Sequence, residues 1–247
     1  MNLFKQTYEN KTVLITGHTG FKGSWLSLWL SQLGSNVIGV SFDIPTEPSH
    51  FNASKLSNRL VDHRLDIMDS KGLKKVVRDS QPDFVFHLAA QALVRQSYQS
   101  PADTIMTNAI GTSNVLDSLM CLDKPVVAVM ITSDKAYDNV EWVWGYRETD
   151  RLGGKDPYSA SKAMAELAIR SYVESFFSAA DSNVRLGIAR AGNVIGGGDW
   201  AKDRIVVDCM ESWSEGKIVD IRNPGATRPW QHVLDVLNGY LILVNRY

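Results

Sequence analysis

Short runs of apolar and β-branched residues alternate with helical patterns along most of this chain, and that alternation limits the fold more than any other feature. The predicted strands are Lys11–Thr16, Ser35–Phe42, Asp83–Leu88 and Val126–Ile131. The predicted helices between them are Phe21–Leu33, Ser70–Ser80 and Pro101–Met120. Continuous apolar runs are typical of strands buried on both faces, and intervening helices imply right-handed crossovers. The sequence therefore predicts an α/β fold with a doubly wound parallel sheet.

A glycine-rich turn, Gly-His-Thr-Gly-Phe-Lys-Gly at 17–23, follows the first predicted strand and opens the first predicted helix. Glycines at this place let the backbone approach a pyrophosphate at a helix N-terminus, which predicts a dinucleotide site. The residues assigned to it are Gly17, Thr19, Gly20, Phe21 and Gly23. An ordinary tight turn is the alternative. The Lys-Gly-Ser order at 22–24 reverses that of a phosphate-binding P-loop, which argues against an ATPase.

Asp43 lies about 20 residues beyond the turn, near the end of the second predicted strand. A carboxylate there accepts hydrogen bonds from a ribose diol, which favours NAD over NADP. A loop residue before Pro45 is the equally weighted alternative. Further residues are predicted to complete the cofactor pocket: Asp66 and Ile67, after a further short strand that precedes them; Ala89, Ala90 and Gln91, after the predicted strand at 83–88; and Asn108, in the helix that follows.

Tyr158 and Lys162 stand four residues apart on a predicted helix, so they share one face. The ammonium beside the phenol favours phenolate by charge pairing, which makes the tyrosine a base near neutral pH. Asp156 and Pro157 are the predicted N-cap and first helical residue, which places Tyr158 in the first turn, where the helix dipole also favours an anion. Both residues are assigned to catalysis and to the cofactor.

Three polar residues, Ser133, Asp134 and Lys135, follow the predicted strand at 126–131. With Tyr158 and Lys162 they form the predicted catalytic group, because they add two ionisable side chains to the proton machinery of an oxidoreductase. The alternative for Asp134 and Lys135 is a solvated ion pair at a strand end.

Composition excludes several classes of function. The chain has 247 residues, 44% of them hydrophobic, and a net charge of −1, and no short segment concentrates lysine and arginine, so no nucleic-acid partner is expected. Cys121 and Cys209 form no CxxC motif and the histidines are scattered, so neither a disulfide framework nor a metal site is predicted, and a reducing cytoplasm fits best. The apolar runs are of strand length, so we expect no membrane association.

From about Ala191 the sequence changes to a glycine-rich loop followed by short elements. We predict an NAD-binding domain over 1–190 and a smaller, incomplete substrate-binding lobe over 191–247. The last predicted helix, Val233–Tyr247, stops without a capping glycine or polar tail, so we expect the chain to be cut short there.

The order of these motifs resembles the extended short-chain dehydrogenase/reductase superfamily, over the whole length of the chain. More narrowly, four segments look like the nucleotide-sugar 4,6-dehydratases that act on CDP-glucose. They are Ile131–Lys135, Trp142–Glu148, Arg190–Trp200 and Arg228–Val233. The resemblance implies a Rossmann-like fold, bound NAD, a homodimer joined through helices, and conversion of CDP-glucose to its 4-keto-6-deoxy product in the cytoplasm, for dideoxyhexose and O-antigen synthesis.

The resemblance also implies roles for single residues. Tyr158 takes the proton from the sugar O4 as hydride leaves C4, and Ser133 binds the same oxygen. Asp134 is the acid that protonates the departing 6-hydroxyl. Related dehydratases carry glutamate where this chain has Lys135, so Lys135 is either the base at C5, as a neutral amine, or an electrostatic stabiliser of the enolate. The substrate is assigned to Asn193, Trp200, Arg204 and Arg228.

Two other functions are compatible with parts of this pattern. A nucleotide-sugar 4-epimerase shares the fold, the cofactor and the Tyr158 and Lys162 pair, but carries small, unreactive residues in place of Asp134 and Lys135. A non-catalytic NAD-binding protein typically lacks the tyrosine and lysine, which are both present here, although a shortened chain can bind NAD without turnover.

Overall fold

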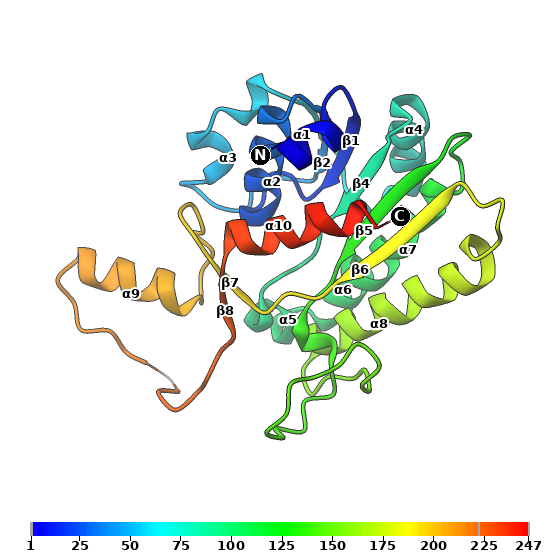
Figure 1. The fold of residues 1–247 in the computed structure, drawn as a ribbon. Coiled ribbons are helices and arrows are strands. Elements are labelled where there is room, and N and C mark those ends of the chain that lie inside the picture. The colour runs from blue at the N-terminus through cyan, green and yellow to red at the C-terminus, as the bar shows by residue number, and fades with distance from the viewer. Residues whose placement is uncertain (1, 222, 247) are drawn as a thin grey trace.

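The computed structural model describes residues 2–221 and 223–246, and its centre is a six-stranded parallel sheet in the order β3-β2-β1-β4-β5-β6 (Figure 1). The strands are β1 Thr12–Thr16, β2 Asn36–Ser41, β3 Val61–Arg64, β4 Phe84–His87, β5 Val126–Ile131 and β6 Val184–Ala189. The predicted α/β fold and doubly wound parallel sheet are confirmed. Because the order reverses between β1 and β4, the carboxyl ends of these strands form the crevice where such sheets bind ligands.

Ten α-helices connect and cover the strands in the described part of the chain. They are α1 Asn2–Tyr8, α2 Phe21–Gln32, α3 His50–Ala53, α4 Ser70–Ser80, α5 Val94–Gln99, α6 Pro101–Ile105, α7 Gly111–Leu119, α8 Pro157–Tyr172, α9 Ile205–Ser214 and α10 Val233–Val244. Short 3-10 turns occupy Leu56–Asn58 and Asp134–Ala136, and π-turns occupy Met106–Ile110 and Val173–Phe177.

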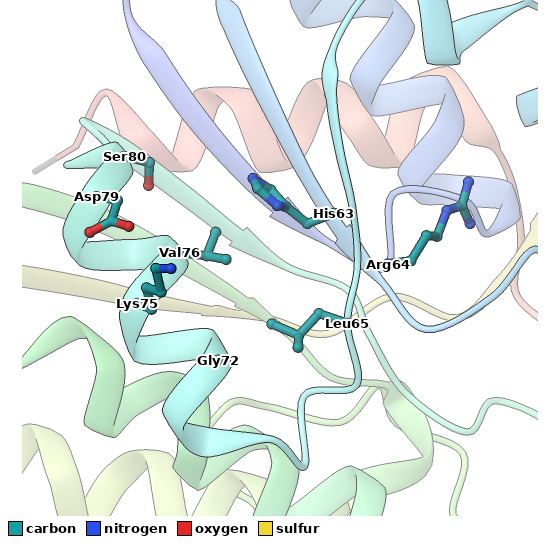
Figure 2. A pocket seen from close by; sticks show the side chains of 8 residues that line it. All are labelled: His63, Arg64, Leu65, Gly72, Lys75, Val76, Asp79 and Ser80. Atoms are coloured by element: carbon teal, nitrogen blue, oxygen red, sulfur yellow. The ribbon is translucent and has the colours of Figure 1, made fainter.

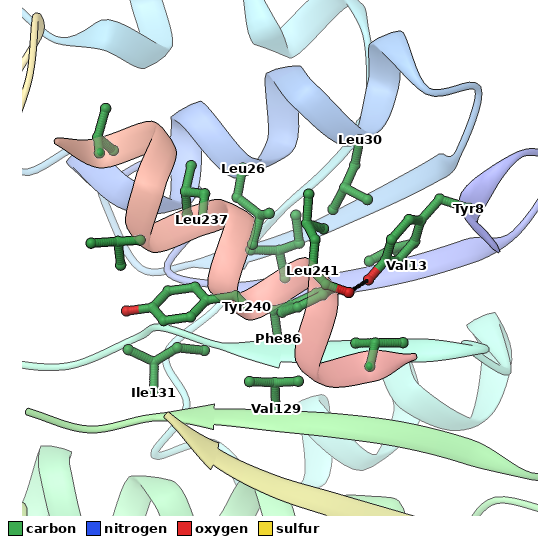
Figure 3. Close-up of a cluster of buried hydrophobic side chains, with 14 of the residues drawn as sticks. Tyr8, Val13, Leu26, Leu30, Phe86, Val129, Ile131, Leu237, Tyr240 and Leu241 are labelled. Atoms are coloured by element: carbon green, nitrogen blue, oxygen red, sulfur yellow. Dashed lines mark hydrogen bonds between the residues drawn. The ribbon is translucent and has the colours of Figure 1, made fainter. Parts of the chain in front are cut away.

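The two faces of the sheet bury separate apolar clusters, because successive residues of a strand point to opposite faces. On one face, Val13 and Ile15 of β1 pack with α2 and α10 (Figure 3). On the other face, Leu14 packs in a cluster with α4, α7 and α8. The continuous apolar runs in the sequence are therefore explained by helices on both sides.

The predicted helix over 101–120 is interrupted in the structure. It divides into α6, a π-turn at Met106–Ile110 and α7. The π-turn contains the buried Asn108, whose side chain binds neighbouring segments rather than solvent. Periodicity alone could not reveal this, since the helical pattern continues through the irregular turn.

The segment after residue 190 divides between two places. The short strands β7 Asn193–Ile195 and β8 Trp230–His232 pair in parallel, and α9 projects away from the sheet in Figure 1. By contrast, α10 lies on the sheet, where Leu237 and Leu241 are fully buried. The division into a domain over 1–190 and a lobe over 191–247 stays a prediction; of the last predicted helix, Tyr247 lies outside the described residues.

Candidate active site

The start of α8 is built as the sequence predicts. Asp156 is the N-cap, and its carboxylate accepts hydrogen bonds from the backbone N–H of Ser159 at 2.9 Å and from the Ser159 hydroxyl at 2.6 Å. Pro157 takes the first helical position, where no N–H is needed. Tyr158 is therefore the second residue of the helix, and it projects from a firmly capped end.

Tyr158 and Lys162 are both buried, with 8% and 6% of their surface exposed. Burial raises the pKa of Tyr158, while a hydrogen bond with Ser133 and the charge of Arg204 act in the opposite direction. The charges of Asp134 and Asp156 raise this pKa further. The expectation of a tyrosine that ionises easily is thus wrong for the protein by itself, because desolvation of the phenolate outweighs the Ser133 hydrogen bond and the Arg204 charge.

Burial also changes the lysine. It lowers the pKa of Lys162 to about 7, the ammonium of Lys22 lowers it further, and the carboxylate of Glu166 raises it. Near neutral pH, Lys162 is therefore a mixture of amine and ammonium, able to give up or take a proton. Both members of the predicted pair are buried on α8, but the raised pKa of Tyr158 and the lowered pKa of Lys162 disfavour an ion pair between them.

Ser133, Asp134 and Lys135 lie at the carboxyl end of β5, as predicted. The Ser133 hydroxyl donates to the Asp134 carboxylate at 3.0 Å and accepts from the backbone N–H of Lys135 at 3.2 Å. Asp134 opens the 3-10 turn, and its backbone N–H donates to the carbonyl of Ala191. These contacts keep Asp134 next to Ser133 and, through it, near Tyr158.

Sequence reasoning missed Lys22, which lies in the glycine turn but acts electrostatically on Lys162 and interacts with the charge of Asp134. Its ammonium lies 3.4 Å from the hydroxyl of Tyr240, a buried residue of α10. Burial and the charge of Arg204 lower the pKa of Lys22 to about 8, while Asp134 and Asp199 raise it. A lysine in the first turn of a helix predicted to bind a phosphate could have indicated a residue of the site. Nothing in the apolar pattern of α10 indicated Tyr240.

Arg204, the N-cap residue of α9, pairs with Asp199 and acts electrostatically on Tyr158. Its guanidinium is 3.2 Å from the Asp199 carboxylate. The Nε of Arg204 is buried, and within the described residues it has no hydrogen-bond partner. A buried donor of this kind is costly unless a ligand supplies an acceptor, so Arg204 fits its predicted contact with substrate.

The glycine turn has the properties that a pyrophosphate requires. Gly20 caps α2 without any side-chain hydrogen bond, so the N–H groups of the first helical turn remain available to an anion. Gly17 has φ +74°, and a Cβ there would lie 2.7 Å from the Ala89 backbone N. Only glycine lets the loops after β1 and β4 meet this closely, and the chain therefore fits a dinucleotide at this crevice.

The adjoining residues are placed as follows. The Thr19 hydroxyl donates to the backbone carbonyl of Asp43 at 2.6 Å, which holds the exposed Asp43 near the turn. The Ala89 backbone N–H donates to the Thr16 hydroxyl at 3.2 Å. These contacts bring three predicted cofactor residues, Thr19, Asp43 and Ala89, to the edge of the sheet, with Ala90 directly after Ala89.

Asn108 and Gln91 hold the crevice together. The Asn108 amide exchanges two hydrogen bonds with the backbone of Gln91, and donates to the Ser161 hydroxyl at 2.8 Å. Asp66 binds the backbone N–H of Met68, and Ile67 is buried in the core. The structure thus gives Asn108, Asp66 and Ile67 contacts within the protein, and their contact with a cofactor stays a prediction.

The remaining substrate candidates lie toward α9. Asn193 begins β7, and Trp200 is 40% exposed beside Asp199. Arg228 is exposed and donates to the carbonyl of Thr227, so the structure does not join it to the group around Tyr158.

A separate cavity of about 520 Å³ lies between β3 and α4 (Figure 2). None of the predicted site residues lines it. Across residues 2–221 and 223–246, no group of three or more His, Cys, Asp and Glu side chains is arranged to hold a metal ion. Over the same residues, no helix is both long and apolar enough to cross a membrane.

A family model described as "GDP-mannose 4,6 dehydratase" matches residues 14–246. The chain belongs to this family. A CDP-glucose 4,6-dehydratase from Salmonella typhimurium is 49% identical, over 98% of this chain and 68% of that protein. The resemblance noted in the sequence is therefore confirmed, and this chain covers about two thirds of that relative's length.

Solved structures give the same fold. A UDP-glucose 4-epimerase from Thermotoga maritima, solved with UDP-glucose, has a TM-score of 0.82 at 25% identity, over 94% of this chain and 72% of that one. A double mutant of a dTDP-glucose 4,6-dehydratase from Streptomyces venezuelae, solved with NAD, has a TM-score of 0.82 at 22% identity, over 94% and 71%. These likenesses confirm the Rossmann-like fold.

Proposed function

We propose that this chain is an NAD-dependent nucleotide-sugar 4,6-dehydratase that converts CDP-glucose to CDP-4-dehydro-6-deoxyglucose. The observation that carries the proposal is the position of Asp134 and Lys135 at the end of β5, near the buried Tyr158 and Lys162. Dehydration needs an acid and a base beyond the groups that move protons at C4. The 49% identity to a CDP-glucose 4,6-dehydratase supports the choice of nucleotide.

NAD, when bound, supplies the hydride acceptor for C4 and later the hydride donor for C6. The glycine turn at 17–23 would hold its pyrophosphate on the N-terminus of α2, and Asp43 would bind a ribose. Tyr158 takes the proton of the sugar O4 while its own hydroxyl proton passes to the neutral amine of Lys162, whose pKa of about 7 suits this relay. Ser133 orients the same sugar oxygen.

Elimination of water from C5 and C6 uses the turn after β5. Asp134 protonates the departing 6-hydroxyl, and Lys135 either removes the C5 proton as a neutral amine or stabilises the enolate as an ammonium. Arg204, with its unpaired buried Nε, binds an anionic or hydroxyl oxygen of the substrate. Asn193 and Trp200 complete the proposed substrate site, and a contact of Arg228 with the substrate stays a prediction.

The test is mass spectrometry of the protein with CDP-glucose, UDP-glucose or dTDP-glucose, each with and without NAD. A product lighter by one water from CDP-glucose supports the proposal, and Tyr158→Phe is expected to reduce its formation by about 10²-fold or more. A new isomer of unchanged mass would favour a 4-epimerase instead. Absence of product despite NAD binding would indicate a non-catalytic binder.

A homodimer is the proposed assembly. Several large apolar side chains of α8 and the helices beside it are exposed, including Ile110, Met120, Met164 and Leu167. Exposed apolar patches of this kind favour association with another protein surface. Sedimentation equilibrium of the chain and of Leu167→Glu tests this, with a monomeric variant as the expected result. The cytoplasm remains the predicted location.

A further inference from the structure

A buried ion pair lies beside the catalytic group, and none of the proposed chemical steps uses it. Glu166 of α8 and Arg190 at the end of β6 have 0% and 11% of their side-chain surface exposed. Arg190 donates from Nε to one carboxylate oxygen at 2.7 Å and from Nη2 to the other. A bidentate pair of this kind fixes both the distance and the relative orientation of its two partners.

The Glu166 carboxylate also reaches a third element. The Thr132 hydroxyl donates to it at 2.7 Å, and Thr132 immediately precedes Ser133 at the end of β5. Glu166 follows Lys162 by four residues and Tyr158 by eight, so all three lie on one face of α8. One carboxylate therefore joins the helix that carries Tyr158 to the strand end that carries Ser133.

Arg190 extends this connection to the far end of the 3-10 turn. Its guanidinium carbon lies 4.4 Å from the centre of the Tyr137 ring, and its Nη1 donates to the backbone carbonyl of Glu148 at 3.3 Å. Tyr137 directly follows the turn at Asp134–Ala136. The turn with Asp134 is thus held at both ends, by Thr132 before it and by Tyr137 after it.

We propose that Glu166 and Arg190 are positioning residues, which together hold Ser133 and Asp134 at a fixed place relative to Tyr158 and Lys162. Neither touches a reacting atom. Misplacement of catalytic groups by about 1 Å costs about 10²-fold in rate, so a rigid connection between the two segments has a large effect on turnover. The inference rests on the proposed function for its kinetic test.

The charge of Glu166 has a second effect, on Lys162. The groups that act on Lys162 are Lys22 from α2, His87 from β4 and Glu166 from α8 itself. Lys22 lowers the pKa of Lys162 and Glu166 raises it, while the buried His87 is neutral near pH 7. Loss of the Glu166 charge is therefore expected to make Lys162 less basic, which can be measured without turnover.

The decisive variant is Glu166→Gln, which keeps the shape of the side chain and an acceptor for Thr132 but removes the charge. We expect kcat for the nucleotide sugar to fall about tenfold or more with little change in KM. We also expect the pH midpoint of Lys162 to fall by about one pH unit. This midpoint is measured by NMR of carbon-13-labelled lysine, and the Lys162 signal is assigned with the Lys162→Met variant. The matched control is Arg170→Gln, because Arg170 lies 4.0 Å from the same carboxylate but is 42% exposed. This control is expected to keep the parent kcat and midpoint.

The proposal would be overturned if the Glu166→Gln protein kept both the parent kcat and the parent pH midpoint of Lys162. It would also be overturned if the loss of activity merely followed the unfolded fraction measured by circular dichroism. Should that variant not fold, Thr132→Val removes only the 2.7 Å hydrogen bond and keeps both charges. It is expected to lower kcat about fivefold without moving the midpoint, and an unchanged kcat would again overturn the proposal. A parent chain that dehydrates no nucleotide sugar would refute the proposed function, whereas the Lys162 midpoint would still test the pair.

Discussion

The N-cap of α8 gives a direct test of how the catalytic helix is held in place. Asp156 accepts two hydrogen bonds from Ser159, from its backbone N–H at 2.9 Å and its hydroxyl at 2.6 Å. Loss of an N-cap side chain costs about 1 kcal/mol, and loss of the hydroxyl contact adds about 0.5 to 1 kcal/mol. We therefore expect Asp156→Ala to lower the free energy of unfolding by about 1.5 to 2 kcal/mol.

Asp156→Asn separates the cap from the charge. Asparagine caps helices as well as aspartate does, and the Ser159 hydroxyl can turn to accept from its Nδ2 group, so we expect to lose mainly the interaction with the helix dipole, about 0.3 to 1 kcal/mol. The charge of Asp156 raises the pKa of Tyr158, so both substitutions lower that pKa. When the pKa of Tyr158 is lower, its phenol loses its proton at lower pH. The acid limb of the kcat profile should therefore move to lower pH in both variants.

Thermal unfolding followed by circular dichroism measures the first effect, and pH-rate profiles measure the second. In a chain of this size, 1 kcal/mol corresponds to about 2 to 4 °C, so Asp156→Ala should melt about 3 to 8 °C below the parent. Equal melting temperatures for the alanine and asparagine variants would refute the capping argument. An acid limb that does not move in either variant would refute the electrostatic one.

Three other perturbations have expected results. Gly17→Ala should destabilise the chain by more than about 1 kcal/mol in urea unfolding, because its φ of +74° and the 2.7 Å approach to Ala89 exclude a side chain; an unchanged midpoint would contradict this. Burial lowers the pKa of His87 from its ordinary 6.5 to about 3 in the folded chain, so the unfolded chain binds more protons between these pH values. The free energy of unfolding should therefore fall as the pH drops through this range, by at most about 1.4 kcal/mol per pH unit. Urea midpoints at pH 7.5 and 4.5 check this, and the drop should be smaller in His87→Gln. Lys22→Met should raise the pKa of Lys162 above about 7, because it removes a neighbouring cation. The NMR titration of Lys162 described above measures this pKa, and an unchanged midpoint would contradict the prediction.

The fold was largely predictable because its signals are local. An apolar run such as Val126–Ile131 is found in the structure with the same bounds, and the helix at Ser70–Ser80 also agrees residue for residue. The π-turn at Met106–Ile110 was not predictable, since its cause is a contact between Asn108 and segments far away in the sequence.

The placement of Tyr158 and Lys162 on α8, and of Ser133 and Asp134 after β5, was predictable, but the electrostatics of these residues was not. Spacing placed Tyr158 and Lys162 on one face, but the sign of their pKa shifts depends on how deeply the fold buries them. Lys22 lies in the first turn of α2 and Glu166 in the body of α8, where a charged residue ordinarily faces solvent. Their role depends on which elements pack around them, and no local pattern contains that information.

The position of α10 affects how the chain acquires its structure during synthesis. Leu241 of this last helix packs in one cluster with Val13 and Leu26, and its carbonyl accepts a hydrogen bond from Tyr8 at 3.0 Å (Figure 3). Contacts between residues so far apart in sequence form slowly, because the intervening chain must first be confined. On the ribosome, one side of the sheet would keep its apolar surface in contact with water until α10 emerges, so chaperone binding to nascent chains should persist until then.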